Sequence, residues 1–205
     1  CALQLPESDL PIDPYVLGLW LGDGSSYSAG FTTGDTELVE AFRKAGYSPR
    51  LYKKPYSYYI DGLRKDLKKL NLIGNKHIPA IYLSASERQR KELLAGLLDT
   101  DGTVLPSGAY EFYACNEHLA KGAYELCLGL GLKCNLRIGI AKLYGEDCGS
   151  KYRIKFTTAQ TLCKLKRKNG RQVSRERGTQ RWRYIVDVRP IPSEPVRCIM
   201  VDSPS

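Results

Sequence analysis

The clearest pattern of apolar and polar positions in this chain occurs twice. Residues 17–24 (LGLWLGDG) and 94–102 (LAGLLDTDG) are apolar runs that small residues interrupt and that end in an acid followed by glycine. In each run two small residues stand four positions apart, which on an α-helix makes a flat strip where another backbone can approach closely. We therefore expect two helices that pack strip against strip.

Each of these runs places an acid at the end of its helix. Asp23 and Asp101 fall on the last turns, and we expect Gly24 and Gly102 to end the helices as left-handed C′ residues. The carboxyl-terminal end of a helix carries the negative end of its dipole, which favours a bound cation beside the carboxylates. Helix packing alone explains either copy, but two copies with similar flanks indicate an internal duplication with a pseudo-twofold axis between the helices.

The flanks of the first run predict a small α+β lobe. Residues 1–13 have no clear period and are expected to be an extended lead-in, after which Asp13 caps a helix that has Pro14 at its first position. After that helix in the sequence we expect two short strands or a hairpin over 25–35 and a helix over 36–45. A second hairpin over 50–60 and a basic helix over 63–70 follow.

The same order returns in the second half of the chain. We expect a helix over 87–101 and then two strands over 102–116. Next come a helix that Asn116 caps and that runs to about Leu130, a strand pair, and a closing basic helix over 159–167. The fold class is therefore α+β, with an αββαββα unit duplicated. We divide the chain into a lead-in (1–13), an N-terminal lobe (14–84), a C-terminal lobe (85–168) and a tail (169–205).

Composition points to a polyanionic partner. The 205 residues carry a net charge of +9. The first 48 residues are acidic overall, so the excess of positive charge lies in the sequence after residue 48. Fourteen tyrosines, many in basic strand-like segments, favour nucleic acid. The seven cysteines form no CxxC pair, so they are expected to be reduced thiols of an intracellular, cytoplasmic protein. Neither a membrane span nor a secretory signal is predicted.

At this point the chain resembles a known family. LAGLLDTDG is nearly the signature of the LAGLIDADG homing endonucleases, and LGLWLGDG resembles its looser first copy in the double-motif, single-chain members. The resemblance covers roughly residues 13–168. It implies two antiparallel saddle-like sheets on double-stranded DNA, with both motif helices at the lobe interface of a monomer. The last residues, from WRYIVDV to the end, resemble strands near the end of intein splicing domains, so we expect a remnant of such a domain.

The paired acids fit phosphodiester hydrolysis, because carboxylates that hold divalent metal activate water and relieve charge on the leaving oxygen. We expect Asp23, Asp101, Gly22 and Thr100 to hold Mg²⁺, for which Mn²⁺ can substitute. The resemblance marks Asp99 as the noncatalytic first acid of its motif.

Basic residues near the metal complete the expected site. The resemblance implies a lysine before Ile-Pro between the motifs, which is Lys76 in NKHIP, and a second one after the last strands in LCKLKRK. We assign Lys166 as that second lysine and keep Lys168 as the alternative. Each lysine would orient the water and stabilise charge on the phosphate.

Base recognition is expected from the outward faces of the sheets, where strand parity decides which side chains face DNA. The segment from residue 164 to 189 is strongly basic; it is either a DNA contact or a disordered arm, and we favour the DNA contact. The candidates for DNA contact are Arg50, Lys53, Tyr56, Tyr58, Glu111, Tyr113, Asn135, Arg137, Lys142, Arg153, Lys155, Lys168 and Arg171.

The leading hypothesis is a site-specific endonuclease, encoded within an intein, that cuts both strands of a long asymmetric DNA site. One alternative is a LAGLIDADG scaffold that binds DNA or RNA without cutting, as maturases do. Another is protein splicing, which Cys1 invites as a nucleophile. CALQLPESD does not resemble a first splicing block, however, and neither a Thr-x-x-His block nor a terminal His-Asn is present.

Overall fold

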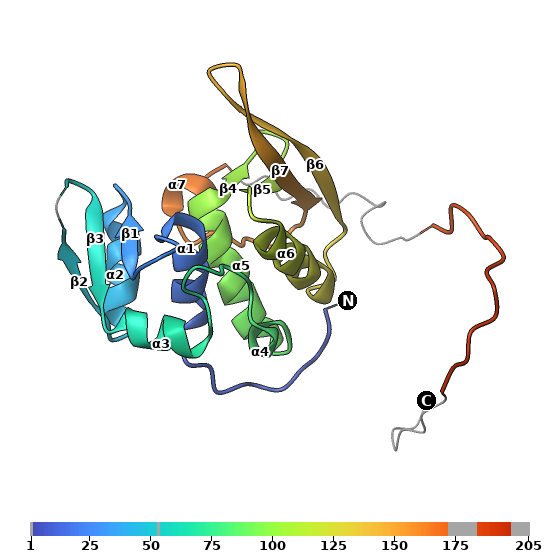
Figure 1. The fold of residues 1–205 in the computed structure, drawn as a ribbon, viewed down its shortest axis with the longest axis horizontal. Helices are drawn as coiled ribbons and strands as arrows, with labels where there is room; N and C mark the ends of the chain where they lie inside the picture. The colour runs from blue at the N-terminus through green and yellow to red at the C-terminus, as the bar shows by residue number, and fades with distance from the viewer. Residues whose placement is uncertain (1, 53, 172–183, 198–205) are drawn as a thin grey trace.

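Two helices lie side by side at the centre of the molecule, α1 (Pro14–Asp23) and α5 (Glu87–Asp101) (Figure 1). The computed structural model describes residues 2–52, 54–171 and 184–197. The side chain of Asp13 caps α1 by accepting a hydrogen bond from the Val16 N–H at 3.1 Å, and Pro14 is its first residue, as predicted. A capping box of Ser86 and Gln89 starts α5, which has the predicted bounds.

The backbones of the two central helices touch. A Cβ atom built on Gly18 would lie 2.9 Å from the Cα of Gly96, and one built on Gly96 would lie 2.8 Å from the Cα of Gly18. One turn further on, Gly22 faces the side chain of Thr100. The strips of small residues therefore face each other as predicted, and because the contact pairs follow the same order along both helices, the two helices end on the same side of the molecule.

The N-terminal lobe has one strand fewer than predicted. In the described residues it contains β1 (Gly30–Thr32), α2 (Thr36–Lys44), β2 (Ser48–Leu51), β3 (Ser57–Asp61), α3 (Leu63–Lys69) and α4 (Ala80–Leu83), and its antiparallel sheet has the order β1-β3-β2. Where a second strand was expected over 25–35, Gly24 makes a single bridge to Phe31. The Ser25 N–H bonds to the Gly30 carbonyl at 2.8 Å, so the chain turns back before a ladder can extend.

The C-terminal lobe has the predicted αββαββα order. After α5 come β4 (Gly102–Val104), β5 (Ala109–Ala114), α6 (Glu117–Gly129), β6 (Cys134–Leu143), β7 (Glu146–Thr157) and α7 (Lys166–Asn169). The four strands form an antiparallel sheet in the order β4-β5-β7-β6. Asn116 caps α6 by accepting a hydrogen bond from the Leu119 N–H at 3.1 Å, as expected from the sequence.

The prediction of a closing helix over 159–167 is wrong. Residues 158–165 form neither helix nor strand, and only the short α7 follows them. Leu162, Cys163 and Leu165 are buried in the core. The backbone N–H groups of Lys164 and Leu165 are bound by the carboxylate of Asp99, which takes up donors that a helix would have used internally.

A single cluster of buried side chains joins the lobes, with Trp20 and Phe42 from one and Phe112 and Phe156 from the other. Residues 2–13 contain neither helix nor strand, in agreement with the predicted lead-in, and they run along the C-terminal lobe. There the Ser8 N–H bonds to the side chain of Gln89 at 3.0 Å. Among the described residues no helix is both long and apolar enough to cross a bilayer.

We predict that Gly96→Val lowers the free energy of unfolding by about 3 kcal/mol, because a branched side chain separates two helices whose backbones are in contact. The measurement is urea denaturation followed by circular dichroism. Gly139→Val in β6 is the matched control, since nothing lies within 4 Å of a Cβ at that position, and its effect should stay within about 0.5 kcal/mol. Equal effects of the two substitutions would contradict the packing argument.

Candidate active site

The two central helices bring a pair of carboxylates together where they end. Asp23 and Asp101 are the last residues of α1 and α5, and both side chains reach the surface. Desolvation by the surrounding protein raises the pKa of each carboxyl, and the negative charge of Asp101 raises the pKa of Asp23 further. Two carboxylates close enough to disfavour each other's charge fit a divalent cation, which relieves the repulsion.

The glycines behind these acids are extended, so the prediction of left-handed C′ residues is wrong. Gly24 has φ −75° and ψ 153°, and Gly102 has φ −96° and ψ 159°. Glycine is needed at positions 24 and 102 because there is no room for a Cβ atom. A Cβ on Gly24 would lie 2.5 Å from Cδ1 of Trp20, and one on Gly102 would lie 2.5 Å from the Cα of Leu98. In both copies the chain leaves the helix directly over its last turn.

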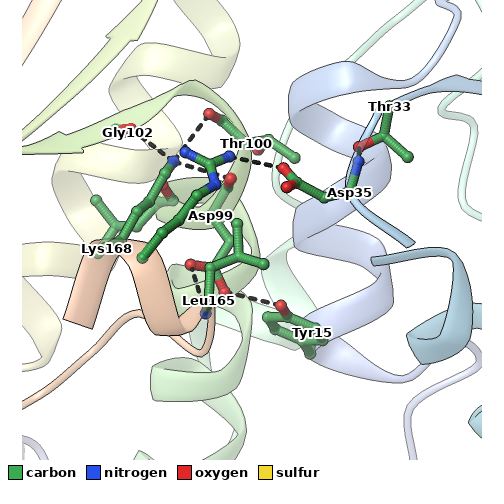
Figure 2. Close-up of polar contacts among 10 residues, drawn as sticks. Tyr15, Thr33, Asp35, Asp99, Thr100, Gly102, Leu165 and Lys168 are labelled. Atoms are coloured by element: carbon green, nitrogen blue, oxygen red, sulfur yellow. Dashed lines mark hydrogen bonds and ion pairs between the residues drawn. The ribbon is translucent and has the colours of Figure 1, made fainter. Parts of the chain in front are cut away.

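A buried lysine binds the end of each central helix. The Nζ of Lys76 donates to the carbonyl oxygens of Leu21, Gly22 and Gly24 at 3.0, 3.1 and 2.6 Å. The Nζ of Lys168 donates in the same way around α5, to the carbonyl oxygens of Leu98, Asp99, Thr100 and Gly102 at 2.6, 2.8, 3.2 and 2.7 Å (Figure 2). Carbonyls in the last turn of a helix have no partner within the helix and carry its negative dipole end, which is why ammonium groups bind there.

The structure gives Lys168, and not Lys166, the position that corresponds to Lys76. Lys168 is buried, with 8% of its surface exposed, whereas Lys166 is exposed at the start of α7. Lys166 and Lys168 are two positions apart, and such residues point about 200° apart on a helix, so one of them must face away from α5. The sequence segment LCKLKRK did not reveal which, because it carries lysines on both sides of α7.

The lysines also bind two groups that we expected at the metal. The carbonyl oxygens of Gly22 and Thr100 each accept a hydrogen bond from a lysine ammonium, at 3.1 and 3.2 Å. At the two helix ends the carboxylates of Asp23 and Asp101 are exposed, so their oxygen atoms are accessible to a cation. Within the described ranges, no group of three or more His, Cys, Asp or Glu side chains forms a further candidate metal site.

Burial changes the proton affinity of both lysines. It lowers the pKa of Lys76 to about 8, against the opposing effect of the charges on Asp101 and Asp23. Burial lowers the pKa of Lys168 as well, and here Cys163 and Asp99 oppose it. An ammonium group with a pKa near 8 can hold a proton at neutral pH and exchange it readily, which suits a group that acts beside a reacting water.

Asp99 points away from the acid pair and into the core, with 1% of its surface exposed. Its carboxylate accepts hydrogen bonds from the Tyr15 hydroxyl at 2.7 Å and from the N–H groups of Lys164 and Leu165 at 2.9 and 3.3 Å (Figure 2). The first motif has the buried Leu21 in its place. This agrees with a noncatalytic role for Asp99, but Tyr15 as its partner was not foreseen.

An ion pair between the lobes was also missed. Arg167 of α7 pairs with Asp35 at 2.6 Å, next to the end of α5 (Figure 2). Asp35 occupies the N-cap position of α2, but its side chain bonds to Arg167 and does not cap the helix. The two residues lie 132 positions apart in the sequence, so no local signal links them.

Six of the predicted DNA contacts lie on the outward face of the C-terminal sheet. The register pairs Glu111 with Lys155, Tyr113 with Arg153 and Arg137 with Arg153, and the alternate residues Tyr110, Phe112, Ile154 and Phe156 are buried on the other face. Asn135 pairs with Lys155 and shares the outward face, while Lys142 lies beyond a register shift between residues 140 and 142.

Glu111 is not an open base contact. It has 4% of its surface exposed, beneath Lys155 at 3.0 Å and Arg153 at 3.7 Å. The Tyr113 hydroxyl also donates to it at 2.6 Å. Hydrogen bonds from Tyr113 and Lys155 outweigh the effect of burial and lower the pKa of the Glu111 carboxyl. Glu111 therefore holds the cations that cover it.

In the N-terminal sheet one predicted contact faces the wrong way. Tyr58 pairs with the buried Phe31 and lies on the same face of β3 as the buried Ile60, so it does not face outward. Tyr59 has the outward position, where its ring lies 5.1 Å below the guanidinium of Arg50. The Nε of Arg50 also donates to Asp61 at 2.7 Å. The period of a strand is two residues, so an error of one position reverses the face.

The remaining candidates lie at the edges of the described structure. Tyr56 is exposed in the β2–β3 turn, with a φ of +66°. Arg171 is exposed at the end of a described range. Lys53 lies outside the described residues, as do residues 172–183 of the basic tail and Cys1.

Comparison with known proteins gives relatives in sequence and in fold. No protein-family model matches the chain. It is 39% identical over 210 residues to the replicative DNA helicase DnaB of Mycobacterium intracellulare; the match includes the whole chain but only 34% of that protein, so the chain spans about a third of the relative's length.

Solved structures of the homing endonuclease I-DmoI share the fold. A mesophilic variant matches with a TM-score of 0.50 and 14% identity, over 72% of this chain and 83% of that one. A variant in complex with its target DNA in the presence of Mn matches equally well, over 72% of this chain and 87% of that one. The chain thus has the fold of I-DmoI, with mixed helices and two antiparallel sheets.

We predict that Lys168→Met lowers the free energy of unfolding by about 2 kcal/mol, because the carbonyls at the end of α5 lose a charged donor. Lys166→Met, the same change at an exposed position of the same helix, should stay within about 0.5 kcal/mol. Chemical denaturation of both variants measures the difference. If Lys166→Met were the more damaging change, the assignment of the buried lysine would be wrong.

Proposed function

We propose that this chain is a site-specific DNA endonuclease that cuts both strands of a long asymmetric duplex site by metal-dependent hydrolysis. The observation that carries the proposal is the pair of carboxylates, Asp23 and Asp101, at the ends of two touching helices, with a buried lysine on each helix end. The fold shared with I-DmoI supports it, since that protein is known in complex with target DNA and Mn.

Each group in the site has a part in the proposed reaction. Asp23 and Asp101 would hold Mg²⁺, or Mn²⁺ in its place, and the metal would supply an activated water and charge relief on the leaving oxygen. Lys76 and Lys168 keep a positive charge beside the carboxylates. From there each lysine would orient the attacking water and stabilise the negative charge that builds up on the phosphate.

The sheets would place the duplex across this site. Asn135, Arg137, Arg153 and Lys155 lie on one face of the C-terminal sheet, and Arg50 lies on the outward face of the N-terminal sheet. Arginine and lysine suit guanine and phosphate oxygens, and asparagine suits adenine. Because the lobes differ in strand number and in side chains, the two half-sites would differ in sequence.

The match to part of a larger protein suggests where the DNA target lies. We propose that the chain is the endonuclease portion of an intein inside a replicative helicase, acting within the cell as a monomer. Its target would then be the helicase gene without the insertion. The match over 34% of the DnaB relative supports this, since the rest of that protein has no counterpart in this chain.

We predict that the protein linearises a plasmid carrying the mycobacterial helicase gene from which the whole insertion, and not only the matching segment, has been removed, in the presence of Mg²⁺ and not after EDTA is added. Asp23→Asn and Asp101→Asn should abolish cleavage and leave DNA binding unchanged, because they remove charge at the metal and not the DNA-facing sheets. Asp9→Asn, at an exposed position of the lead-in, is the control and should cut normally. Binding without cleavage by the unmodified protein would favour the maturase-like alternative.

A second prediction tests the DNA-facing surface. Arg137→Ala should weaken binding to duplex DNA and reduce the salt slope of log K by about 1, as expected for one lost phosphate contact. Lys121→Ala removes a similar charge from α6, where it pairs with Glu117, and should leave both quantities unchanged. Fluorescence anisotropy over a salt series measures them, and an equal effect of the two variants would argue against the proposed surface.

A further inference from the structure

We propose that Asp99, together with Tyr15, is a positioning residue that sets the place of Lys168 and thereby controls the cleavage of one DNA strand but not the other. The inference rests on the proposed function and assigns a task to a buried group that the reaction itself does not use. Asp99 touches neither DNA nor the solvent-facing acid pair.

The contacts of Asp99 converge on the start of α7. Its carboxylate is buried and binds three donors, the Tyr15 hydroxyl of α1 and the N–H groups of Lys164 and Leu165. Leu165 is the N-cap residue of α7, and its carbonyl oxygen accepts the N–H of Lys168 at 3.0 Å. Asp99 is therefore linked to Lys168 through one residue.

The short helix needs this support. α7 has only four residues, and one helical turn does not hold its own conformation in water, because nucleation is costly. The N–H groups that Asp99 binds lie just ahead of that turn. If they were released, the backbone of the segment that carries Lys168 would no longer be tied to α5, and side-chain contacts such as those of the Lys168 ammonium would have to hold it there alone.

Lys76 is held in place by contacts different from those that hold Lys168. The first motif carries Leu21 where the second has Asp99, so this position of α1 cannot bind backbone N–H groups ahead of Lys76 as Asp99 does ahead of Lys168. Lys76 is held instead through its own carbonyl oxygen, which accepts from the Asn116 side chain at 3.1 Å, and its Nζ lies 5.1 Å from the centre of the Trp20 ring. The two lysines thus depend on separate contacts, and a change at Asp99 reaches only one of them.

This asymmetry predicts strand-specific defects. Asp99→Asn puts an amide N–H₂ among backbone donors, and Tyr15→Phe removes one donor from the carboxylate. In both variants we expect one strand to be cut about tenfold to a hundredfold more slowly, a typical cost of a misplaced group in an active site. The other strand should be cut within about twofold of the normal rate, so nicked DNA accumulates.

The experiment uses the full chain and a duplex labelled differently on each strand, with single-turnover rates measured for both. Lys168→Met identifies the strand that depends on Lys168, and Lys76→Met the other. Tyr82→Phe is the matched control, because it removes a hydroxyl of the same kind that is also buried, here bonded to the backbone of Ile12 at 2.8 and 3.0 Å. It should leave the ratio of the two strand rates unchanged.

The outcomes separate the two proposals. If Asp99→Asn and Tyr15→Phe slow the same strand as Lys168→Met, the positioning role is supported. Equal slowing of both strands, slowing of the strand that depends on Lys76, or a changed ratio in Tyr82→Phe would overturn it while the endonuclease proposal stands. Absence of cleavage by the unmodified protein on its target would overturn the endonuclease proposal and the strand-specific role with it.

Discussion

The contact between the backbones of α1 and α5 is the constraint on which the rest of the structure depends. Gly18 and Gly96 allow the helices to touch, and the pairing of Gly22 with Thr100 keeps them in register to their ends. Because both helices run in the same direction, their last residues meet on one side of the molecule. The acid pair, the two lysines and the turn into each lobe are all consequences of that meeting.

Two helix ends in one place concentrate negative potential. Unpaired carbonyls and two carboxylates would repel one another if nothing balanced them. A buried lysine ammonium group at each helix end, from Lys76 and Lys168, balances this negative potential. Burial desolvates both ammonium groups and lowers their pKa. The charges of the proposed active site are therefore fixed by the fold itself, since the same lysines bind the carbonyls at the helix ends. Preorganised charge of this kind is what catalysis of charge transfer requires.

The halves are similar in plan and different in detail. The N-terminal sheet replaces a strand with a single bridge, and the first motif has Leu21 where the second has Asp99. On both sheets an acid lies beside outward cations, Asp61 beside Arg50 and Glu111 beneath Lys155 and Arg153. Such acids limit the directions in which long basic side chains can point. Two lobes that hold their cations differently are suited to an asymmetric partner.

The sequence by itself determined the central helices, the Asp13 cap of α1, the facing strips of small residues and the acid pair, because each of these depends on spacing within a few residues. It also placed Asn116 as a cap and the outward alternation of Glu111 and Tyr113. Only the tertiary structure decided which lysine serves α5, that Tyr58 faces the core, and that Gly24 and Gly102 are required by space and not by φ. It alone joined Asp99 to Tyr15 and Arg167 to Asp35. These contacts link residues far apart in the chain or depend on rotation by a single position, and no local pattern records either.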